Sequence, residues 1–215
     1  YPQFFATKAI ESKLDQGIKN GIIWHTQGSG KTALSYYNVR YLTDYFQKRG
    51  TIAKFYFVVD RLDLLTQAAN EFRARGLEVE EINSKEDFIK NIQTTGTSNN
   101  TGKATITVVN IQKFKEDSAK INIDAGYSTH LQRVFFIDEA HRGYSPQGSF
   151  LANLLEADKD AVKIALTGTP LLKEERESWR VFGEYIDTYY YDKSIADGYT
   201  LKLMREPIET IYKER

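Results

Sequence analysis

A glycine-rich run that contains a lysine is the strongest chemical signal in the sequence. The run Gly28-Ser29-Gly30-Lys31-Thr32 follows a short apolar segment and precedes a helical pattern. Glycines allow backbone N–H groups to close around phosphate oxygens, and the positive end of the following helix favours the same anion. In such a loop the lysine reaches the β- and γ-phosphates, and the next hydroxyl binds Mg²⁺. The run therefore predicts a nucleotide site with Lys31 as its cation and Thr32 as a metal ligand.

The opening position of this loop departs from the usual pattern. That pattern begins with glycine five residues before Gly30, and His25 occupies the position here. A glycine-rich linker that binds nothing is the structural alternative. The apolar segment before the loop and the helical pattern after it favour the phosphate site.

Two carboxylates follow another apolar segment. Residues 134–137 lead directly into Asp138 and Glu139, and His141 comes two residues later. In a phosphoryl-transfer site Asp138 would hold Mg²⁺, Glu139 would orient or deprotonate the attacking water, and His141 would lie beside the γ-phosphate or a bound polymer. An acid pair that complements a helix dipole is the structural alternative. The phosphate loop weakens that alternative, because the two motifs together make one catalytic site.

A third apolar segment, at 163–166, ends in Thr167-Gly168-Thr169-Pro170. A turn of this composition is an ordinary connection in a protein. Its hydroxyl groups could also relay hydrogen bonds between the acid pair and a moving neighbour. We therefore expect Thr167, Gly168 and Thr169 to couple the nucleotide site to motion.

The elements that must position these motifs alternate along the chain. The patterns predict strands at 22–24, 55–59, 78–82, 105–109, 134–137 and 162–166. They predict helices from Leu34 to Gly50, from a cap at Asp63 to Gly76, and from a capping box at Ser84 and Asp87 to Ile92. Such alternation predicts an α/β domain with a largely parallel sheet, whose ligands bind at the carboxyl ends of the strands. The polar stretch 94–102 predicts a flexible, exposed loop.

Composition and charge exclude several classes of protein. The 215 residues contain 29 Lys and Arg, 29 Asp and Glu, and no cysteine. The balance excludes a globally basic nucleic-acid binder but not a local basic groove. The missing cysteines exclude disulfides, cysteine-bound zinc, iron–sulfur clusters and thiol nucleophiles. No apolar run reaches the roughly 20 residues of a membrane helix. The first residue, Tyr1, and the charged last residues lead us to expect a piece of a longer protein.

In this order, the three motifs resemble motifs I, II and III of superfamily 2 helicases and translocases. The segment Ile23–Thr32 more closely resembles the phosphate loop of the restriction (motor) subunit of type I restriction–modification enzymes, in which histidine at the opening position is usual. Further segments resemble motif Ia, the next polymer-contact motif and later parts of that subunit: 58–67, 110–114, 138–142, 166–171, 182–183 and 194–199.

The resemblance implies a RecA-like α/β domain that acts as the first lobe of an ATP-driven translocase on double-stranded DNA. It implies ATP and Mg²⁺ as cofactors, methyltransferase and specificity subunits as partners, and a prokaryotic cytoplasm as the location. We expect residues 1–215 to form this single lobe, without the nuclease domain and the second RecA-like lobe. The run Glu11-Ser12-Lys13 mimics part of a nuclease motif, but no suitable Asp precedes it, so we expect helix surface there.

The resemblance also assigns binding residues. Gln3 resembles the adenine-reading glutamine that precedes the phosphate loop, and Thr26 and Gln27 belong to the nucleotide-binding loop. DNA phosphate contacts are expected from Arg61, Gln67, Gln112 and Lys113. Solvated surface charges are the structural alternative for these DNA-contact residues.

Three other functions remain open from the motifs. The chain could belong to another superfamily 2 member in DNA repair, chromatin remodelling or RNA unwinding. It could be a nucleotide-gated binding module without useful turnover. A small-molecule kinase is disfavoured, since it needs neither the Thr-Gly-Thr-Pro turn nor motif Ia. An arginine finger, worth about 10³–10⁵ in rate, should come from a second lobe, so the isolated chain should be nearly inactive.

Overall fold

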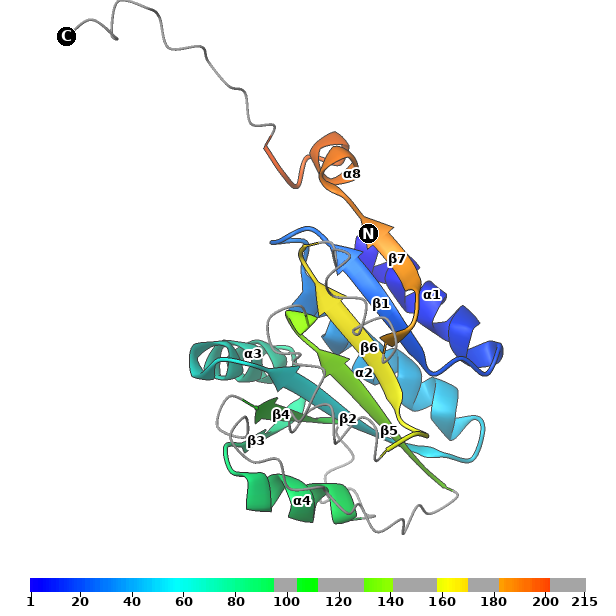
Figure 1. The fold of residues 1–215 in the computed structure, drawn as a ribbon, viewed down its shortest axis with the longest axis vertical. Helices are drawn as coiled ribbons and strands as arrows, with labels where there is room; N and C mark the ends of the chain where they lie inside the picture. The colour runs from blue at the N-terminus through cyan, green and yellow to red at the C-terminus, as the bar shows by residue number, and fades with distance from the viewer. Residues whose placement is uncertain (95–103, 112–129, 141–157, 170–181, 202–215) are drawn as a thin grey trace, which may run out of the picture.

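The computed structural model describes residues 1–94, 104–111, 130–140, 158–169 and 182–201, in which helices and strands alternate (Figure 1). In chain order the elements are α1 (Pro2–Asp15), β1 (Asn20–His25), α2 (Lys31–Gln47), β2 (Ile52–Val59), α3 (Leu62–Ala74), β3 (Glu78–Ile82), α4 (Lys85–Gln93), β4 (Thr105–Asn110), β5 (Leu131–Ile137), β6 (Val162–Thr167), β7 (Tyr185–Tyr189) and α8 (Tyr191–Ala196). The predicted loop at 94–102 falls, beyond Thr94, outside the described residues. So do His141, Gln112 and Lys113.

The seven strands form one sheet in the order β3-β4-β2-β5-β6-β1-β7, and every pairing is parallel. The predicted α/β class is therefore confirmed. Because all strands run the same way, their carboxyl ends share one edge of the sheet. The loop after β1, the acid pair after β5 and the Thr167 turn after β6 all lie on that edge, as the strand-end rule requires.

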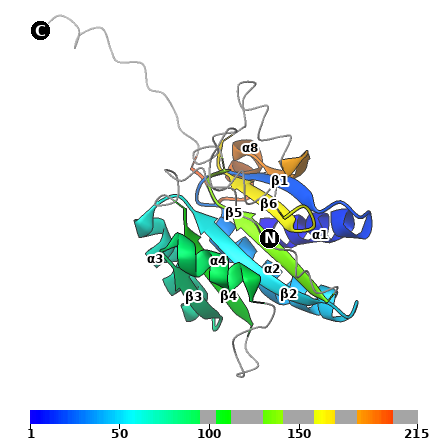
Figure 2. The ribbon, with the colours of Figure 1, turned by 60° about the horizontal axis from the view of Figure 1, so that its bottom comes forward.

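Helices cover the two faces of the sheet, and alternate strand residues face the two layers. In β2, Phe57 and Val59 pack in a core cluster with residues of α1, α2 and α3. Tyr56 and Val58 belong to a second cluster that contains Phe88 of α4, which lies on the other face (Figure 2). Burial on both faces explains why the β2 sequence is continuously apolar from Phe55 onward.

Helix ends agree with the sequence patterns at α4 and depart from them at α3. The Ser84 side chain accepts the backbone N–H of Asp87 at 3.2 Å and donates to Asp87 Oδ2 at 2.6 Å, so the predicted cap at Ser84 is confirmed. The predicted cap at Asp63 is wrong, because Arg61 is the N-cap and makes no side-chain cap hydrogen bond. Asp63 instead lies in the first turn, where its negative charge complements the helix dipole.

Some elements had weak or no sequence signals. The expected helix surface at residues 11–13 belongs to α1, which begins with Pro2 in its first turn. The strand β7 and the short helix α8 were not predicted. β7 pairs with β1 along the edge of the sheet and so flanks the strand that leads into the phosphate loop. None of the helices in the described ranges combines the length and the apolar composition needed to cross a bilayer.

Candidate nucleotide site

The connection between β1 and α2 has a backbone that only glycine adopts freely. Gly28 has φ 78° and Gly30 has φ 85°, both in the left-handed region. A Cβ on Gly30 would lie 2.7 Å from Gln3 Nε2. Gly30 is also the N-cap of α2, so the connection leads straight into the positive end of that helix. This geometry suits the binding of a phosphate group.

Gln3 lies against this loop although the two are far apart in sequence. Its Nε2 donates to the backbone oxygen of Ser29 at 2.6 Å. The contact forms because α1 packs against α2 and presents Gln3 beside the start of that helix. Gln3 also lines an open cavity of about 600 Å³, together with Tyr37, Arg40 and Tyr41 of α2. The structure thus brings together the loop and the glutamine that the resemblance selected.

Three strand ends converge on Lys31. Its Nζ lies 4.0 Å from Glu139 Oε1, and the lysine side chain is only 9% exposed. A Cβ on Gly168, after β6, would lie 3.4 Å from the same Nζ and 3.6 Å from the backbone nitrogen of Gln27. Adjacent strands place these groups together, since β6 lies between β1 and β5 in the sheet. The cation, the acid pair and the glycine turn therefore make one site.

The carboxyl group of Asp138 is largely buried, and burial changes its pKa. Burial raises the pKa of its carboxyl group to about 6; Lys31 opposes this rise, and the charges of Glu139 and Asp60 add to it. Its Oδ1 atom is inaccessible to solvent and has no hydrogen-bond partner in the described part of the chain. A buried carboxylate with an unused oxygen is a suitable ligand for a divalent cation.

Glu139 has an unusual backbone. Its φ of 47° lies in the left-handed region, which a non-glycine residue enters at a cost of order 1–3 kcal/mol. Such conformations persist where the surrounding structure imposes them, and they gather at functional sites. From this strained position the Glu139 carboxylate lies 4.0 Å from Lys31 Nζ.

The buried polar atoms of the loop fit a nucleotide with its metal. Thr26 Oγ1 and Ser29 Oγ are buried and have no hydrogen-bond partner among the described residues. Each such atom costs about 1–3 kcal/mol when it is left without a partner. Phosphate oxygens and a hydrated cation would supply the partners that Thr26, Ser29 and Asp138 lack.

Three further predicted residues, Thr167, Arg61 and Gln67, lie within the described part of the chain. Thr167 Oγ1 donates to the backbone oxygen of Thr169 at 2.8 Å, which holds the turn closed. Arg61 and Gln67 are exposed, and Arg61 binds Asp63 through two hydrogen bonds of 2.9 and 3.1 Å. Arg61 follows β2 on the strand-end edge, and its hydrogen bonds among the described residues go to Asp63 rather than to the phosphate loop.

The sequence patterns missed Asp60 as a site residue. Its Oδ1 is buried without a hydrogen-bond partner among the described residues, and its charge contributes to the raised pKa of Asp138. Asp60 directly follows β2, which is the strand next to β5. The rule that polar residues at neighbouring strand ends form the site could have identified it.

Comparison with known proteins gives a consistent result. Residues 2–212 match the family described as SWI2/SNF2 ATPase. The chain is 28% identical, over 95% of its length and 22% of the relative, to the type I restriction enzyme MjaVIIIP endonuclease subunit of Methanocaldococcus jannaschii. It is 30% identical, over 97% of its length and 22% of the relative, to the type I restriction enzyme SsaAORF53P endonuclease subunit of Staphylococcus saprophyticus. The resemblance inferred from the motifs is confirmed.

Solved structures with a similar fold include a nuclease-deletion mutant of the Type ISP restriction-modification enzyme LlaGI with a DNA substrate mimic. That match has a TM-score of 0.63 and 14% identity, and covers 98% of this chain and 21% of the other. A fragment of an HsdR subunit of a type I restriction enzyme from Vibrio vulnificus YJ016 matches with a TM-score of 0.54 and 20% identity, over 92% of this chain and 31% of the other. At these identities the matches show the fold alone, and they confirm the expected RecA-like fold.

Proposed function

Because this chain belongs to the SWI2/SNF2 ATPase family, we propose that it is the ATP-hydrolysing lobe of a motor that moves along double-stranded DNA in a type I restriction enzyme. The convergence of Lys31, Glu139 and Gly168 at three strand ends carries this proposal. The chain spans about a fifth of the length of its curated relatives, at 22% of each. DNA cleavage, a second RecA-like lobe, and assembly with methyltransferase and specificity subunits are therefore proposals about the longer protein.

In hydrolysis, the oxygen of a water molecule bonds to the γ-phosphorus while the bond to the bridging oxygen of ADP breaks. Lys31 would neutralise charge on the β- and γ-phosphate oxygens. Glu139 would orient the attacking water and accept its proton at the carboxylate. Thr32 and Asp138 would hold Mg²⁺, which supplies further positive charge where the phosphoryl group transfers. The loop from Thr26 to Gly30 would bind the phosphates through its backbone N–H groups.

We propose that the adenine base of the nucleotide binds beside Gln3. The side-chain amide of glutamine offers one donor and one acceptor in a plane, which suits the edge of adenine. Tyr37 and Tyr41, from the same cavity, supply aromatic surface, and Arg40 supplies a cation. The contact between Gln3 and Ser29 supports this placement, because it puts the amide next to the phosphate loop.

DNA contacts are proposed for the strand-end edge beside β2. Arg61 follows β2 and is exposed, and Gln67 is exposed on α3. In the sequence, Gln112 and Lys113 come after β4, the neighbour of β2. Contacts of this kind would be made to backbone phosphates and would carry no sequence information. Thr167, Gly168 and Thr169 are proposed to couple the nucleotide state to movement, since Gly168 lies against both Lys31 and Gln27.

A binding experiment tests the nucleotide site. In the intact protein that carries this chain, Lys31→Ala should weaken Mg·ATP binding by at least about tenfold, because charge-assisted hydrogen bonds contribute about 1.5–3 kcal/mol. Titration calorimetry or a fluorescent ATP analogue measures the change. Lys48→Ala is the matched control, since Lys48 lies at the other end of α2 and is 70% exposed. Equal affinities for Lys31→Ala and wild type would contradict the assignment.

A further inference from the structure

A pair between the buried His25 and the partly buried Asp187 joins the start of the phosphate loop to β7. His25 Nε2 lies 2.5 Å from Asp187 Oδ2, and the two side chains are 1% and 21% exposed. The residues are 162 positions apart in the sequence. His25 stands where the usual phosphate loop has glycine. The larger imidazole ring of His25 at this position is held by the carboxylate of Asp187.

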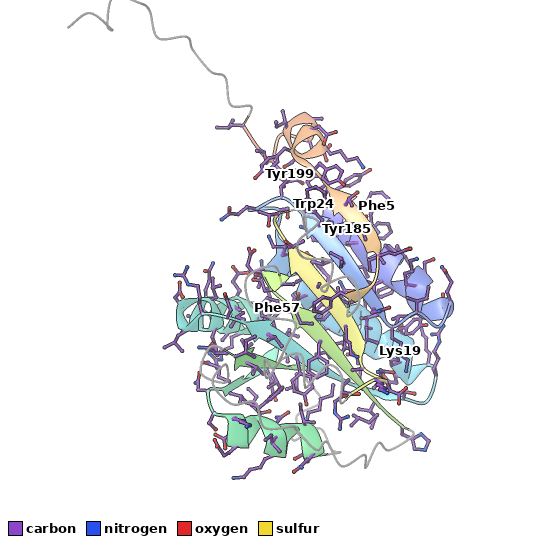
Figure 3. All side chains as sticks on the ribbon, in the orientation of Figure 1. Phe5, Lys19, Trp24, Phe57, Tyr185 and Tyr199 are labelled. Atoms are coloured by element: carbon purple, nitrogen blue, oxygen red, sulfur yellow. The ribbon has the colours of Figure 1, made fainter. Side chains whose placement is uncertain are left out.

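An irregularity in β7 directs Asp187 toward His25. Ile22 pairs with Tyr185 and Ile23 pairs with Asp187, so Ile186 is an extra residue in the strand. Tyr185 lies beside Trp24 on one face of the sheet, with 5.7 Å between ring centroids (Figure 3). Regular alternation would return Asp187 to that same face. The extra residue reverses the alternation, as β-bulges do when they redirect a side chain.

The other face carries both Ile186 and Asp187. Ile186 packs over Gly21, where an added Cβ would lie only 2.7 Å from its side chain. Gly21, Ile23 and His25 are two residues apart and so share a face of β1. The glycine thus leaves room for Ile186, and the extra residue lets Asp187 reach the histidine ring two positions further along.

A second contact holds the next loop residue. The backbone N–H of Thr26 donates to the backbone oxygen of Tyr189, the last residue of β7, at 3.1 Å. The other ring nitrogen, His25 Nδ1, is buried without a hydrogen-bond partner among the described residues. The ring orientation is therefore fixed by Asp187, and the backbone that follows is fixed by the end of the same strand.

We propose that Asp187 is a positioning residue for nucleotide hydrolysis, which acts by holding the His25 ring and, through it, the backbone of the phosphate loop. This inference rests on the proposed function of that loop. Asp187 itself does not touch the nucleotide. Its carboxylate fixes the starting point of the loop, so that Lys31 and the loop N–H groups meet the phosphates in a defined geometry.

A double-mutant cycle in the intact protein tests the proposal. Asp187→Ala should lower kcat/KM for ATP by about tenfold, consistent with the loss of one charge-assisted hydrogen bond. Asp187→Asn should restore most of the activity, because its side-chain oxygen still accepts from the ring. In a His25→Gly background, adding Asp187→Ala should change kcat/KM by less than about twofold, since no ring remains to be held. Asp192→Asn, an exposed carboxylate in α8, is the control.

Thermal unfolding and a nucleotide-binding assay accompany the cycle. A folded Asp187→Ala variant with wild-type kcat/KM overturns the inference, and so does an additive loss in the double variant. If Asp187→Ala alone does not fold, the double variant His25→Gly/Asp187→Ala is the decisive test. It should fold and have the same kcat/KM as His25→Gly. An unfolded or inactive double variant overturns the inference. Lys31→Ala separates the two claims. If Lys31→Ala binds ATP as the wild type does, the proposed function is contradicted. If Lys31→Ala loses ATP binding while Asp187→Ala remains fully active, only the role of Asp187 is contradicted.

Discussion

Asp138 combines a cost to stability with the proposed role of a Mg²⁺ ligand. Its carboxyl group is largely buried, its Oδ1 has no hydrogen-bond partner among the described residues, and burial raises its pKa to about 6. The ordinary value is 3.8, so the folded protein resists ionising a group that a metal site needs ionised. A bound cation would remove that conflict, because it favours the carboxylate form.

The pH dependence of stability tests this residue. Between about pH 4 and 6 the folded state binds more protons at Asp138 than the unfolded state, so its contribution to the free energy of unfolding falls as pH rises. Above the pKa of Asp138 in the folded protein, this contribution to the free energy of unfolding is lost completely. Asp138→Asn should therefore be more stable than wild type at pH 7.5 by about 1–3 kcal/mol, and the difference should shrink toward pH 4.

Chemical denaturation without Mg²⁺ or nucleotide, repeated across this pH range, measures the difference. Asp192→Asn serves as the control for removing an exposed carboxylate. A stabilisation by Asp138→Asn that does not vary with pH would contradict the raised pKa.

At the scale of elements, the prediction from sequence worked where the signal is local. β2 and β5 are buried on both faces, so their runs of apolar residues predicted strands. The capping residue Ser84 predicted the start of α4. β7 has the sequence Tyr-Ile-Asp-Thr-Tyr and exists through its pairing with β1. Nothing local could show that its third residue, Asp187, meets His25, because that contact depends on pairing with β1, which is distant in sequence, and on the extra residue Ile186 within β7.

Gly21→Ala tests the packing of β7 on β1. The new methyl group would lie 2.7 Å from Ile186 Cγ2, so the side chain or the strand must shift, at a cost of about 1–3 kcal/mol. Thermal or urea unfolding should show a clear destabilisation. Ile186→Ala makes room for the new methyl group. It should therefore lower the free energy of unfolding less in the Gly21→Ala background than in the wild type. Additive losses in this pair would contradict the close approach.

At the scale of the whole molecule, a net charge of zero is compatible with a DNA-binding motor lobe. Binding to backbone phosphates depends on where the basic residues lie, and only a few are needed on the strand-end edge. Arg61, which follows β2, and the phosphate loop, which follows β1, share that edge. In the proposed motor, this arrangement would link hydrolysis to DNA contact through the strand ends.

Charge reversal tests the proposed DNA surface. In the intact protein, Arg61→Glu should weaken duplex binding and reduce the slope of log affinity against log salt by about 1, since one phosphate contact is lost. Nucleotide affinity should not change. Arg75→Glu is the matched control, because Arg75 lies at the opposite end of α3 and also pairs with a carboxylate, that of Glu71. Equal salt slopes for wild type and Arg61→Glu would contradict the assignment.

The most direct measurement is ATP hydrolysis by the intact protein with and without duplex DNA, comparing wild type with Glu139→Gln. We expect DNA to stimulate the wild type, and we expect Glu139→Gln to bind Mg·ATP normally but to have a kcat lower by about 10²–10⁴-fold. Glu86→Gln, an exposed change in α4, should behave as wild type. Undiminished turnover in Glu139→Gln, or a wild type that duplex DNA does not stimulate, would contradict the assignment of this chain as the ATP-hydrolysing lobe of a DNA motor.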